Sequence, residues 1–374
     1  MNQPYEIPYS IPYTPQETRE DLLRAFDSGI ISGSGPAVSE VESLLAARLG
    51  MSKSLTVSNG SAAIRLALQV GKIRPGMKVV LPGWGFHVAA NIAYSMGARL
   101  EFRDVGIDSW CLDPDDNQDL INTDEKSILV LIHTLGNFGK MESLTDFKSA
   151  SNLFIVEDSA EALFSEFHGK PLGTIFDVGT YSFHAAKTIT SGEGGLFVAS
   201  ESKDYERALL IRNHGMTPDR PYFHHIVGDN YRLSNILAAL LLSQIKNIDE
   251  IIFKRERVYK SYLRELKSFP PESFIQPTDQ DGFFPWGFGF RVPSDSTLST
   301  AQIREKMKLR GVDTRPGFTS AVELPYFDKS MLLKGMELDN SESLAKQVIL
   351  LPHYPDMTDE DIFKVCDSLI EILS

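Results

Sequence analysis

The sequence predicts an α/β protein: a three-layer α/β/α large domain around a mostly parallel sheet, followed by a smaller α+β domain. Strand-like and helix-like runs alternate as far as about residue 245. Such alternation is typical of a parallel sheet with helices on both faces. A long helical pattern over residues 234–266 then leads into a region with a different order of elements. We therefore expect a large domain over residues 1–245, including an N-terminal arm, and a small domain over residues 246–374.

The individual elements follow from hydrophobic periodicity. Apolar runs at residues 79–82 and 128–132 predict buried strands, with a helix over residues 88–96 between them. Beyond residue 266, the sequence predicts one strand at residues 288–292 and two amphipathic helices. These helices are expected at residues 300–310 and 359–373. The chain of 374 residues is long enough for both domains to bury a core.

A lysine follows one strand-like run directly. Residues 178–183 are rich in the β-branched and aromatic side chains that strands favour, and Lys187 comes just beyond them, before a turn at Gly192. A lysine held in this way can condense with an aldehyde when its amine is partly uncharged. A surface lysine in a loop is the ordinary alternative, and the choice between the two depends on other residues.

A carboxylate ends another strand-like run. Residues 152–158 are mostly apolar and finish with Glu157 and Asp158. Ligands of open α/β sheets bind at the carboxyl ends of the strands. Pyridoxal 5′-phosphate needs one carboxylate against its pyridine nitrogen, which Asp158 could supply, and a lysine for its aldehyde, which Lys187 could supply. A helix-capping role for Asp158 is the alternative, but the pair together favours a cofactor site.

A third segment has the features of a phosphate site. A short strand at residues 55–57 leads into Ser58, Asn59, Gly60 and Ser61, and a helix-forming run follows. A helix N-terminus presents N–H groups and a favourable dipole to an anion. Hydroxyls from Ser61 and Ser182 could add to it, although an ordinary helix cap would look similar. The chain contains neither a P-loop nor a GxGxxG turn, which argues against a nucleotide triphosphatase or a nicotinamide dehydrogenase.

Composition excludes several other classes. The net charge is −13, which disfavours binding to nucleic acid through its phosphates. No apolar run is long enough to span a membrane, and the N-terminus lacks the pattern of a signal peptide. The two cysteines, Cys111 and Cys366, are too few for a disulfide framework and lack metal-ligand spacing. We expect a cytoplasmic protein without a metal, a membrane partner or a nucleic-acid partner.

Taken together, these segments resemble the DegT/StrS family of sugar aminotransferases, members of the aspartate-aminotransferase superfamily of fold type I. The resemblance extends from about Ile31 to the C-terminus and consists of several motifs in family order. The motifs are SGSGP at 32–36, SNGS at 58–61, LPGWGF at 81–86, HTLGN at 133–137, EDSAEA at 157–162, SFHAAK at 182–187 and GDNYRLSN at 228–235. The last of these, with Thr314-Arg315-Pro316, is similar to the perosamine-synthase branch.

The resemblance implies pyridoxal 5′-phosphate as the cofactor and assigns its contacts. Lys187 matches the lysine that bonds to the cofactor and acts as general acid and base, and Asp158 matches the partner of the pyridinium nitrogen. Phe86 matches the aromatic residue that stacks on the cofactor ring. Glu161 occupies the place where the family usually has Gln or Glu, near the cofactor's 3′-hydroxyl.

Further contacts implied by the resemblance concern the phosphate. Gly60, Ser61 and Ser182 match residues that contact it within one chain. Asn230 matches a residue that reaches the phosphate of the neighbouring subunit's cofactor, which implies a homodimer with shared active sites. A plain turn residue is the alternative for Asn230, because Gly-Asp-Asn is also a turn signal.

By resemblance, the expected reaction moves an amino group from L-glutamate to a nucleotide-linked keto-sugar, with a 4-keto-6-deoxyhexose as acceptor, for amino-sugar or surface-polysaccharide biosynthesis. Substrate contacts are expected from His87, Arg232 and Arg315. Two departures bear on the substrate. The family's Pro-Leu-His element after the arginine is absent, since residues 317–322 read GFTSAV. In addition, His87 replaces a residue that is usually smaller or hydroxylated.

Three other functions remain open at this stage. An aminocyclitol or keto-acid aminotransferase would keep the cofactor site but recognise no nucleotide. A sugar dehydratase of the family or a regulatory cofactor-binding protein would keep the phosphate site but release no 2-oxoglutarate from glutamate. The dehydratase is disfavoured, because some dehydratases of the family replace the lysine with histidine, whereas this chain keeps Lys187 and has His184 three residues earlier. A non-catalytic α/β binding domain would bind no cofactor aldehyde.

Overall fold

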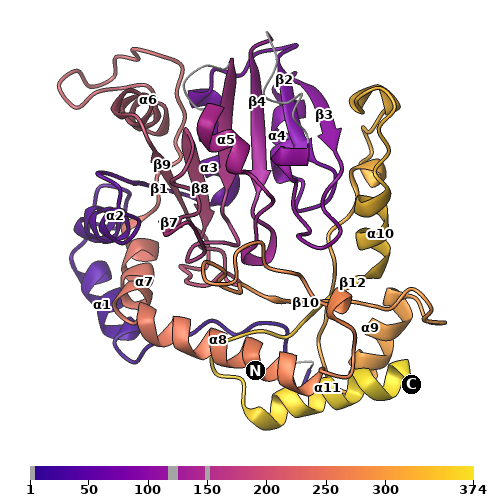
Figure 1. The fold of residues 1–374 in the computed structure, drawn as a ribbon. Coiled ribbons are helices and arrows are strands. Elements are labelled where there is room, and N and C mark those ends of the chain that lie inside the picture. Colours follow the sequence, from indigo (N-terminus) through magenta and orange to yellow (C-terminus); the bar gives the residue numbers. More distant parts are fainter. Residues whose placement is uncertain (1–4, 117–124, 148–151) are drawn as a thin grey trace.

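The computed structural model describes residues 5–116, 125–147 and 152–374, and its centre is a seven-stranded sheet in the order β1-β9-β8-β5-β4-β2-β3 (Figure 1). Strands β3, β2, β4, β5 and β8 pair in parallel, and β9 runs antiparallel to both β8 and β1. The strands are β1 (Leu55–Val57), β2 (Lys78–Pro82), β3 (Arg99–Arg103), β4 (Ser127–Ile132), β5 (Leu153–Asp158), β8 (Val178–Ser182) and β9 (Gly195–Ala199). The predicted mostly parallel sheet is confirmed.

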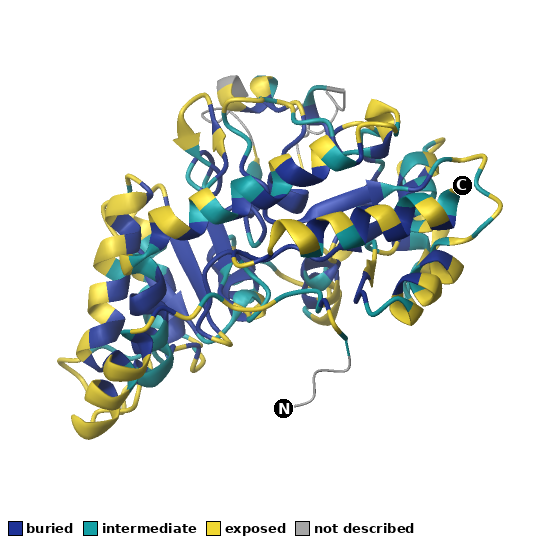
Figure 2. Ribbon diagram, turned by 90° about the horizontal axis from the view of Figure 1, so that it is seen from below, coloured by how far each residue is buried: buried dark blue, intermediate teal, exposed yellow. Residues whose placement is uncertain are grey.

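Both faces of this sheet are buried. Successive side chains of a strand point to opposite faces, and Val79 and Leu81 accordingly enter one apolar core while Val80 enters another. Figure 2 shows the strands as a buried layer, with the exposed residues on the outer sides of the helices. The helices of this part are α1 (Thr18–Asp27), α2 (Pro36–Arg48), α3 (Gly60–Val70), α4 (Val88–Ser95), α5 (Glu142–Phe147), α6 (Ser202–Arg212) and α7 (Asn235–Lys246). Burial on both faces explains the continuous apolar runs of the sequence.

The long helical pattern over residues 234–266 forms two helices. Helix α7 ends at Lys246, and α8 (Ile248–Glu265) begins after Asn247. The Asn247 side chain donates hydrogen bonds to Glu17 Oε1, at 2.6 Å, and to the main-chain oxygen of Ser243, at 2.9 Å. Asparagine favours such local bonds over a regular helix. The expectation of one continuous helix is therefore corrected at this residue.

The C-terminal part has its own small sheet and core. Its strands lie in the order β10-β12-β11, and both pairings are antiparallel. Side chains of α8, such as Val258 and Tyr262, pack on this sheet together with those of two further helices. Its elements are β10 (Phe288–Arg291), α9 (Thr300–Leu309), β11 (Arg315–Pro316), α10 (Asp339–Gln347), β12 (Val348–Leu351) and α11 (Asp359–Leu373), and a separate hairpin comprises β6 (Glu166–Phe167) and β7 (Lys170–Pro171). The boundary between residues 245 and 246 stays a prediction.

The N-terminal arm reaches this second core. Ile7 is buried in it, accepts a hydrogen bond from the N–H of Asp313 and donates its own N–H to the main-chain oxygen of Gly311. The arm, which we predicted as part of the large domain, thus packs partly against the small one. Across the described ranges, no helix combines the length and apolar character that crossing a bilayer would require.

Candidate active site

Seven of the eight predicted cofactor residues line one cavity of about 530 Å³. They are Gly60, Ser61, Phe86, Asp158, Glu161, Ser182 and Lys187. The parallel register pairs Ile132 of β4 with Asp158 of β5, and Asp158 with Thr180 of β8. Because parallel strands end at the same edge of a sheet, residues far apart in the sequence meet there.

The amine of Lys187 is held by two side chains. Its Nζ atom lies 3.2 Å from Oε1 of Glu161 and 4.1 Å from the centre of the Trp286 ring. The loop that carries it leaves β8 and folds back on itself, and the N–H of Ala185 donates to the main-chain oxygen of Gly192 at 3.0 Å. Gly192 adopts a φ of 81°, which glycine tolerates without strain. The lysine is therefore fixed at the cavity wall, with 15% of its side chain exposed.

The carboxylate of Asp158 is almost fully buried in the same cavity. It accepts the N–H of Ala160 at 3.2 Å. Burial raises the pKa of Asp158 to about 6, and the Ala160 hydrogen bond and the charge of Lys187 oppose that rise only in part. A buried carboxylate of this kind favours a cationic partner, since a nearby positive charge stabilises the ionised form.

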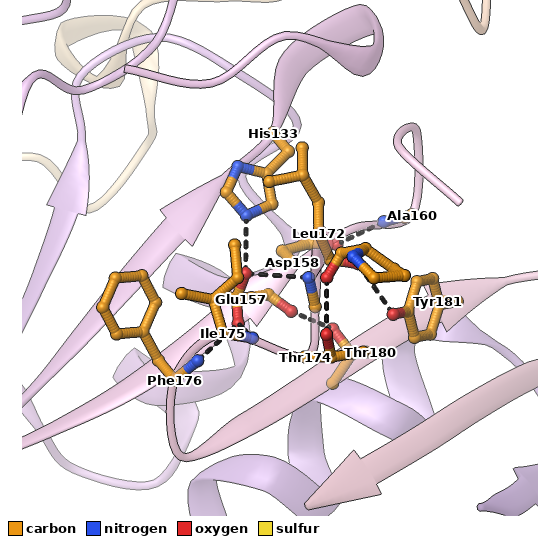
Figure 3. A network of polar contacts seen from close by, with 12 residues as sticks. His133, Glu157, Asp158, Ala160, Leu172, Thr174, Ile175, Phe176, Thr180 and Tyr181 are labelled. Carbon is orange, nitrogen blue, oxygen red and sulfur yellow. Dashed lines mark hydrogen bonds and ion pairs between the residues drawn. The ribbon is translucent and has the colours of Figure 1, made fainter. Parts of the chain in front are cut away.

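The neighbouring carboxylate, Glu157, does not line the cavity and lies within a network of polar contacts (Figure 3). Its oxygens accept the N–H groups of Gly173 at 2.7 Å, and of Ile175 and Phe176 at 2.9 Å, and His133 Nε2 lies 3.2 Å away. A fully buried carboxylate with this many partners stabilises the segment after the β6–β7 hairpin. Glu157 is thus structural, and Asp158 is the carboxylate available to a ligand.

Glu161 is positioned by a strained turn. Its Oε2 atom accepts the N–H of Leu135 at 3.0 Å, while Oε1 faces Lys187. Leu135 has a φ of 54°, in the left-handed region that branched residues rarely adopt. Such strain persists only where the surrounding structure imposes it, and it is common at functional sites.

The first turn of α3 closes one end of the cavity. Asn59 caps the helix, since its Oδ1 atom accepts the N–H of Ala62 at 2.8 Å. Gly60 lies so close to β8 that an added Cβ would stand 2.9 Å from Cβ of Ser182. Ser61 and Ser182 therefore flank a helix N-terminus that opens on the cavity, an arrangement that suits a phosphate.

These residues fit pyridoxal phosphate. The helix N-terminus suits its phosphate, the buried Asp158 suits its ring nitrogen, and Lys187 suits its aldehyde carbon. Phe86 also borders the cavity and is 60% exposed, so its ring is free to face a ligand. Within the described residues, no cluster of His, Cys, Asp and Glu side chains suits a metal ion.

The other predicted residues lie outside this cavity. Asn230 and Arg232 are exposed and contact each other, and Arg232 also approaches His214 Nε2 at 3.3 Å. Arg315 pairs with Asp313 at 3.0 Å and borders a separate cavity of about 170 Å³. Within one chain, the structure does not bring these three predicted residues to the lysine.

His87 is also not a cavity residue. Its Nε2 atom lies 3.0 Å from the main-chain oxygen of Thr319, and burial lowers its pKa. The ring is buried beside Phe102. His87 therefore connects the start of α4 to the segment at residues 317–322, and it does not support the predicted substrate contact.

Two aromatic residues of the cavity were not predicted. Phe318 stands in the segment where the family's Pro-Leu-His element is absent, and it faces Phe86 at 6.3 Å between ring centres. Its main-chain oxygen accepts a hydrogen bond from Trp84 Nε1 at 2.8 Å. The other is Trp286, which no local motif marks.

A buried arginine behind the lysine was missed as well. Arg255 on α8 donates to the main-chain oxygens of Lys187, at 3.2 Å, and of Trp286, at 2.8 Å, and it lies 3.2 Å from His353 Nδ1. Burial and the guanidinium lower the pKa of His353 to about 3, so its ring is neutral and accepts the hydrogen bond. A charged residue between the buried Ile251 and Val258 of one helical stripe was the available signal.

Comparison with known proteins agrees with this geometry. Residues 12–370 match the DegT/DnrJ/EryC1/StrS aminotransferase family. GDP-perosamine synthase from Escherichia coli O157:H7 is 29% identical over 98% of this chain and 99% of its own length. PseC from Helicobacter pylori, an aminotransferase involved in the biosynthesis of pseudoaminic acid, superposes with a TM-score of 0.88 at 24% identity, covering 98% of this chain and 99% of that one.

A GDP-4-keto-6-deoxymannose-3-dehydratase superposes with a TM-score of 0.87 at 22% identity, covering 97% of this chain and 100% of that one. These two solved structures establish the shared fold. The family match covers nearly the whole chain and includes every motif of the cavity. The protein therefore belongs to the DegT/DnrJ/EryC1/StrS aminotransferase family and is a pyridoxal-phosphate-dependent aminotransferase of fold type I.

Proposed function

We propose that this protein transfers an amino group from L-glutamate to the keto group of a nucleotide-linked 4-keto-6-deoxyhexose. The observation that carries the proposal is the meeting of Lys187 and Asp158 in one cavity, next to the helix N-terminus of α3. The similarity to GDP-perosamine synthases along nearly the full chain supports a nucleotide-linked sugar as the acceptor. L-Glutamate as donor rests on the family expectation.

Each side chain has a definite task in this proposal. Pyridoxal phosphate, when bound, supplies a ring that accepts the electrons of a broken C–H bond. Asp158 holds the proton at the ring nitrogen, and Ser61, Ser182 and the first turn of α3 bind the phosphate. The Lys187 amine binds the aldehyde carbon and, when free, moves a proton to and from the substrate carbon that exchanges its amine. Glu161 orients that amine from 3.2 Å.

The proposal includes a homodimer with shared active sites. Asn230 and Arg232 are exposed and lie outside the cavity of their own chain. Among the described residues that line the cavity, the titratable ones are Asp158, Glu161, Lys187, Glu193 and His184, and none is an arginine. An anionic nucleotide would gain a cation if a second copy of the chain brought its Arg232 to this opening.

The test starts from the purified protein with pyridoxal phosphate. Wild type should show the visible absorbance of a lysine-bound cofactor and release 2-oxoglutarate from L-glutamate. Lys187→Ala should still fold, as a cooperative thermal transition would show, and should lose turnover, because the described lining of the cavity contains no other lysine to bind the aldehyde carbon. Near-normal transamination by this variant would refute the role of Lys187.

A panel of acceptors then separates the remaining functions. We expect amination of GDP-, dTDP- or UDP-linked 4-keto-6-deoxyhexoses and no amination of cyclitol ketones or free keto acids. The reverse preference would indicate an aminotransferase without nucleotide recognition. Loss of a sugar hydroxyl without amine transfer would indicate a dehydratase, and absence of the cofactor absorbance would indicate a binding domain.

A further inference from the structure

The amine of Lys187 lies next to an aromatic residue, Trp286, which has no role in the function proposed above. Its Nζ atom lies 4.1 Å from the centre of the Trp286 ring, and the Glu161 carboxylate lies 3.2 Å from the same atom. A cation over an indole face is attracted by the ring's electrons, and the attraction is largest where water is excluded. Trp286 is buried, with 7% of its surface exposed, and it borders the proposed cofactor cavity.

Trp286 is itself fixed to the lysine segment at two points. Its indole Nε1 donates to the main-chain oxygen of Ala186, the residue before the lysine, at 3.1 Å. Its own main-chain oxygen accepts a hydrogen bond from Arg255 at 2.8 Å. The same guanidinium donates to the main-chain oxygen of Lys187 at 3.2 Å. Arg255 thus ties the backbone of the lysine to the backbone of the tryptophan.

The orientation of Arg255 is determined in turn by its surroundings. Arg255 is 2% exposed, and its guanidinium lies 3.2 Å from the neutral ring of His353. No rotation of the arginine can occur without breaking several buried hydrogen bonds. The distance between the lysine backbone and the indole face is therefore fixed from behind the cavity.

We infer that Trp286 is a positioning residue for Lys187, holding its amine over the indole ring whenever that amine is not bonded to the cofactor. The inference rests on the proposed function, in which the lysine amine is alternately bonded and free. Four rotatable bonds leave a free lysine amine many positions. An aromatic face restrains the amine without forming a hydrogen bond that must be broken before the next step, and Arg255 keeps that face in place.

The contact can be tested in the protein without cofactor, where activity plays no part. The chain has three tryptophans, so the emission of Trp286 is the difference between wild type and Trp286→Phe. Lys187→Met should change the indole emission in the wild-type background and leave it unchanged in the Trp286→Phe background. An equal change in both backgrounds, or no change in either, would overturn the contact.

The role is tested by the half-reaction of the loaded enzyme with L-glutamate, followed by stopped-flow absorbance. Trp286→Leu should slow that half-reaction about tenfold at saturating donor, with the Kd of the donor unchanged, while Trp286→Phe stays within about threefold. Trp110→Phe, another buried tryptophan, is the matched control and should react like wild type. If the half-reaction rate of Trp286→Leu stays within about twofold of the wild-type rate, the inference is overturned, because that difference is no larger than the weakest cation–π contacts would produce.

A fluorinated tryptophan at position 286 covers the case in which Trp286→Leu does not fold. 5,7-Difluorotryptophan keeps the shape and the N–H donor but weakens the ring's attraction for a cation. A slower half-reaction supports the inference, and an unchanged rate overturns it. If the wild-type enzyme fails to react with any amino donor, the proposed function as a whole is refuted. If the wild type reacts normally and Trp286→Leu reacts equally fast, only the inference about Trp286 is overturned.

Discussion

Lys187 and Glu161 form an ion pair of 3.2 Å inside the cavity, and the second oxygen of Glu161 is bound to the N–H of Leu135. One oxygen of the carboxylate thus contacts the reacting amine, and the other accepts a main-chain N–H from the turn that follows β4. The first prediction follows from this double contact. Glu161→Ala removes both bonds and should lower kcat/KM about 10- to 100-fold, the range for hydrogen bonds to charged groups.

Glu161→Gln is the matched variant for that measurement. The amide can still accept the N–H of Leu135 and keeps the side-chain volume. We expect kcat/KM within about tenfold of wild type. Equal losses in the two variants would show that the charge of Glu161, rather than its place, is what matters.

The buried carboxyl group of Asp158 should lower the stability of the fold at neutral pH, although the proposed reaction depends on it. Burial raises its pKa to about 6 in the folded protein, above its ordinary value of 3.8. The folded protein therefore favours the protonated form of Asp158. The stability that this proton contributes to the fold is lost as the pH rises from about 4 to about 6. Without cofactor, Asp158→Asn should be more stable than wild type at pH 8 by roughly 2–3 kcal/mol, and equally stable below pH 4.

Urea denaturation of the cofactor-free protein at both pH values measures this difference. The same variant should lose transamination, because an amide cannot hold the proton at the ring nitrogen. A variant that is less stable than wild type at pH 8 would contradict the assignment of the buried carboxylate.

His353 predicts the opposite dependence on pH. Its folded pKa is lowered to about 3 by burial and by Arg255, so the unfolded chain takes up the proton first. The stability that it contributes is present above pH 6.5 and is lost as the pH falls towards 3. When the pH is lowered from 7 to 4, the free energy of unfolding of His353→Asn should fall by about 3 kcal/mol less than that of wild type. If the free energy of unfolding depends on pH in the same way in the two proteins, the prediction is contradicted.

Gly60 predicts a steric limit on the phosphate end of the cavity. A Cβ at this position would lie 2.9 Å from Ser182 Cβ, so Gly60→Ala must displace the start of α3 or the end of β8. We expect the Kd of pyridoxal phosphate to rise about tenfold, although alanine is the better helix former. Absorbance titration measures this change. Ser182→Ala, which removes the hydroxyl without adding volume, separates the steric effect from the lost hydrogen bond.

The proposed dimer predicts rescue between two inactive variants. Lys187→Ala and Asn230→Ala should each be inactive or nearly so as pure proteins. When the two are unfolded and refolded together, mixed dimers contain one intact site if Asn230 serves the partner's cavity, and about a quarter of the wild-type activity should return. If Asn230 serves its own chain, mixing restores nothing.

Much of the cavity could be predicted because its chemistry is local in the sequence. Lys187 follows β8, Asp158 ends β5 and Gly60 begins α3, so strand ends and a helix start suffice to mark them. The order of the strands and their parallel pairing then bring these ends to one edge. The mostly parallel sheet was predicted correctly for the same reason, since alternation of strands and helices is itself a property of the sequence.

Other positions depended on contacts between distant segments. Trp286 bonds to Ala186 and Arg255 bonds to Lys187 from the far side of the predicted domain boundary, across sequence separations of 100 and 68 residues. His87 faces Thr319, 232 residues away, and the structure buries its ring, so its predicted contact with the substrate has no support within one chain. No periodicity within a segment reports which distant segment will lie against it.

The sequence by itself determined the fold class, the cofactor and the three strand and helix ends that surround it, because each follows from short-range pattern and residue chemistry. Only the tertiary structure decided that Glu157 is enclosed by the N–H groups of Gly173, Ile175 and Phe176, and that Trp286 and Arg255 meet the lysine segment. Neighbouring residues of a strand point to opposite faces, and which face becomes the cavity depends on how the whole chain packs.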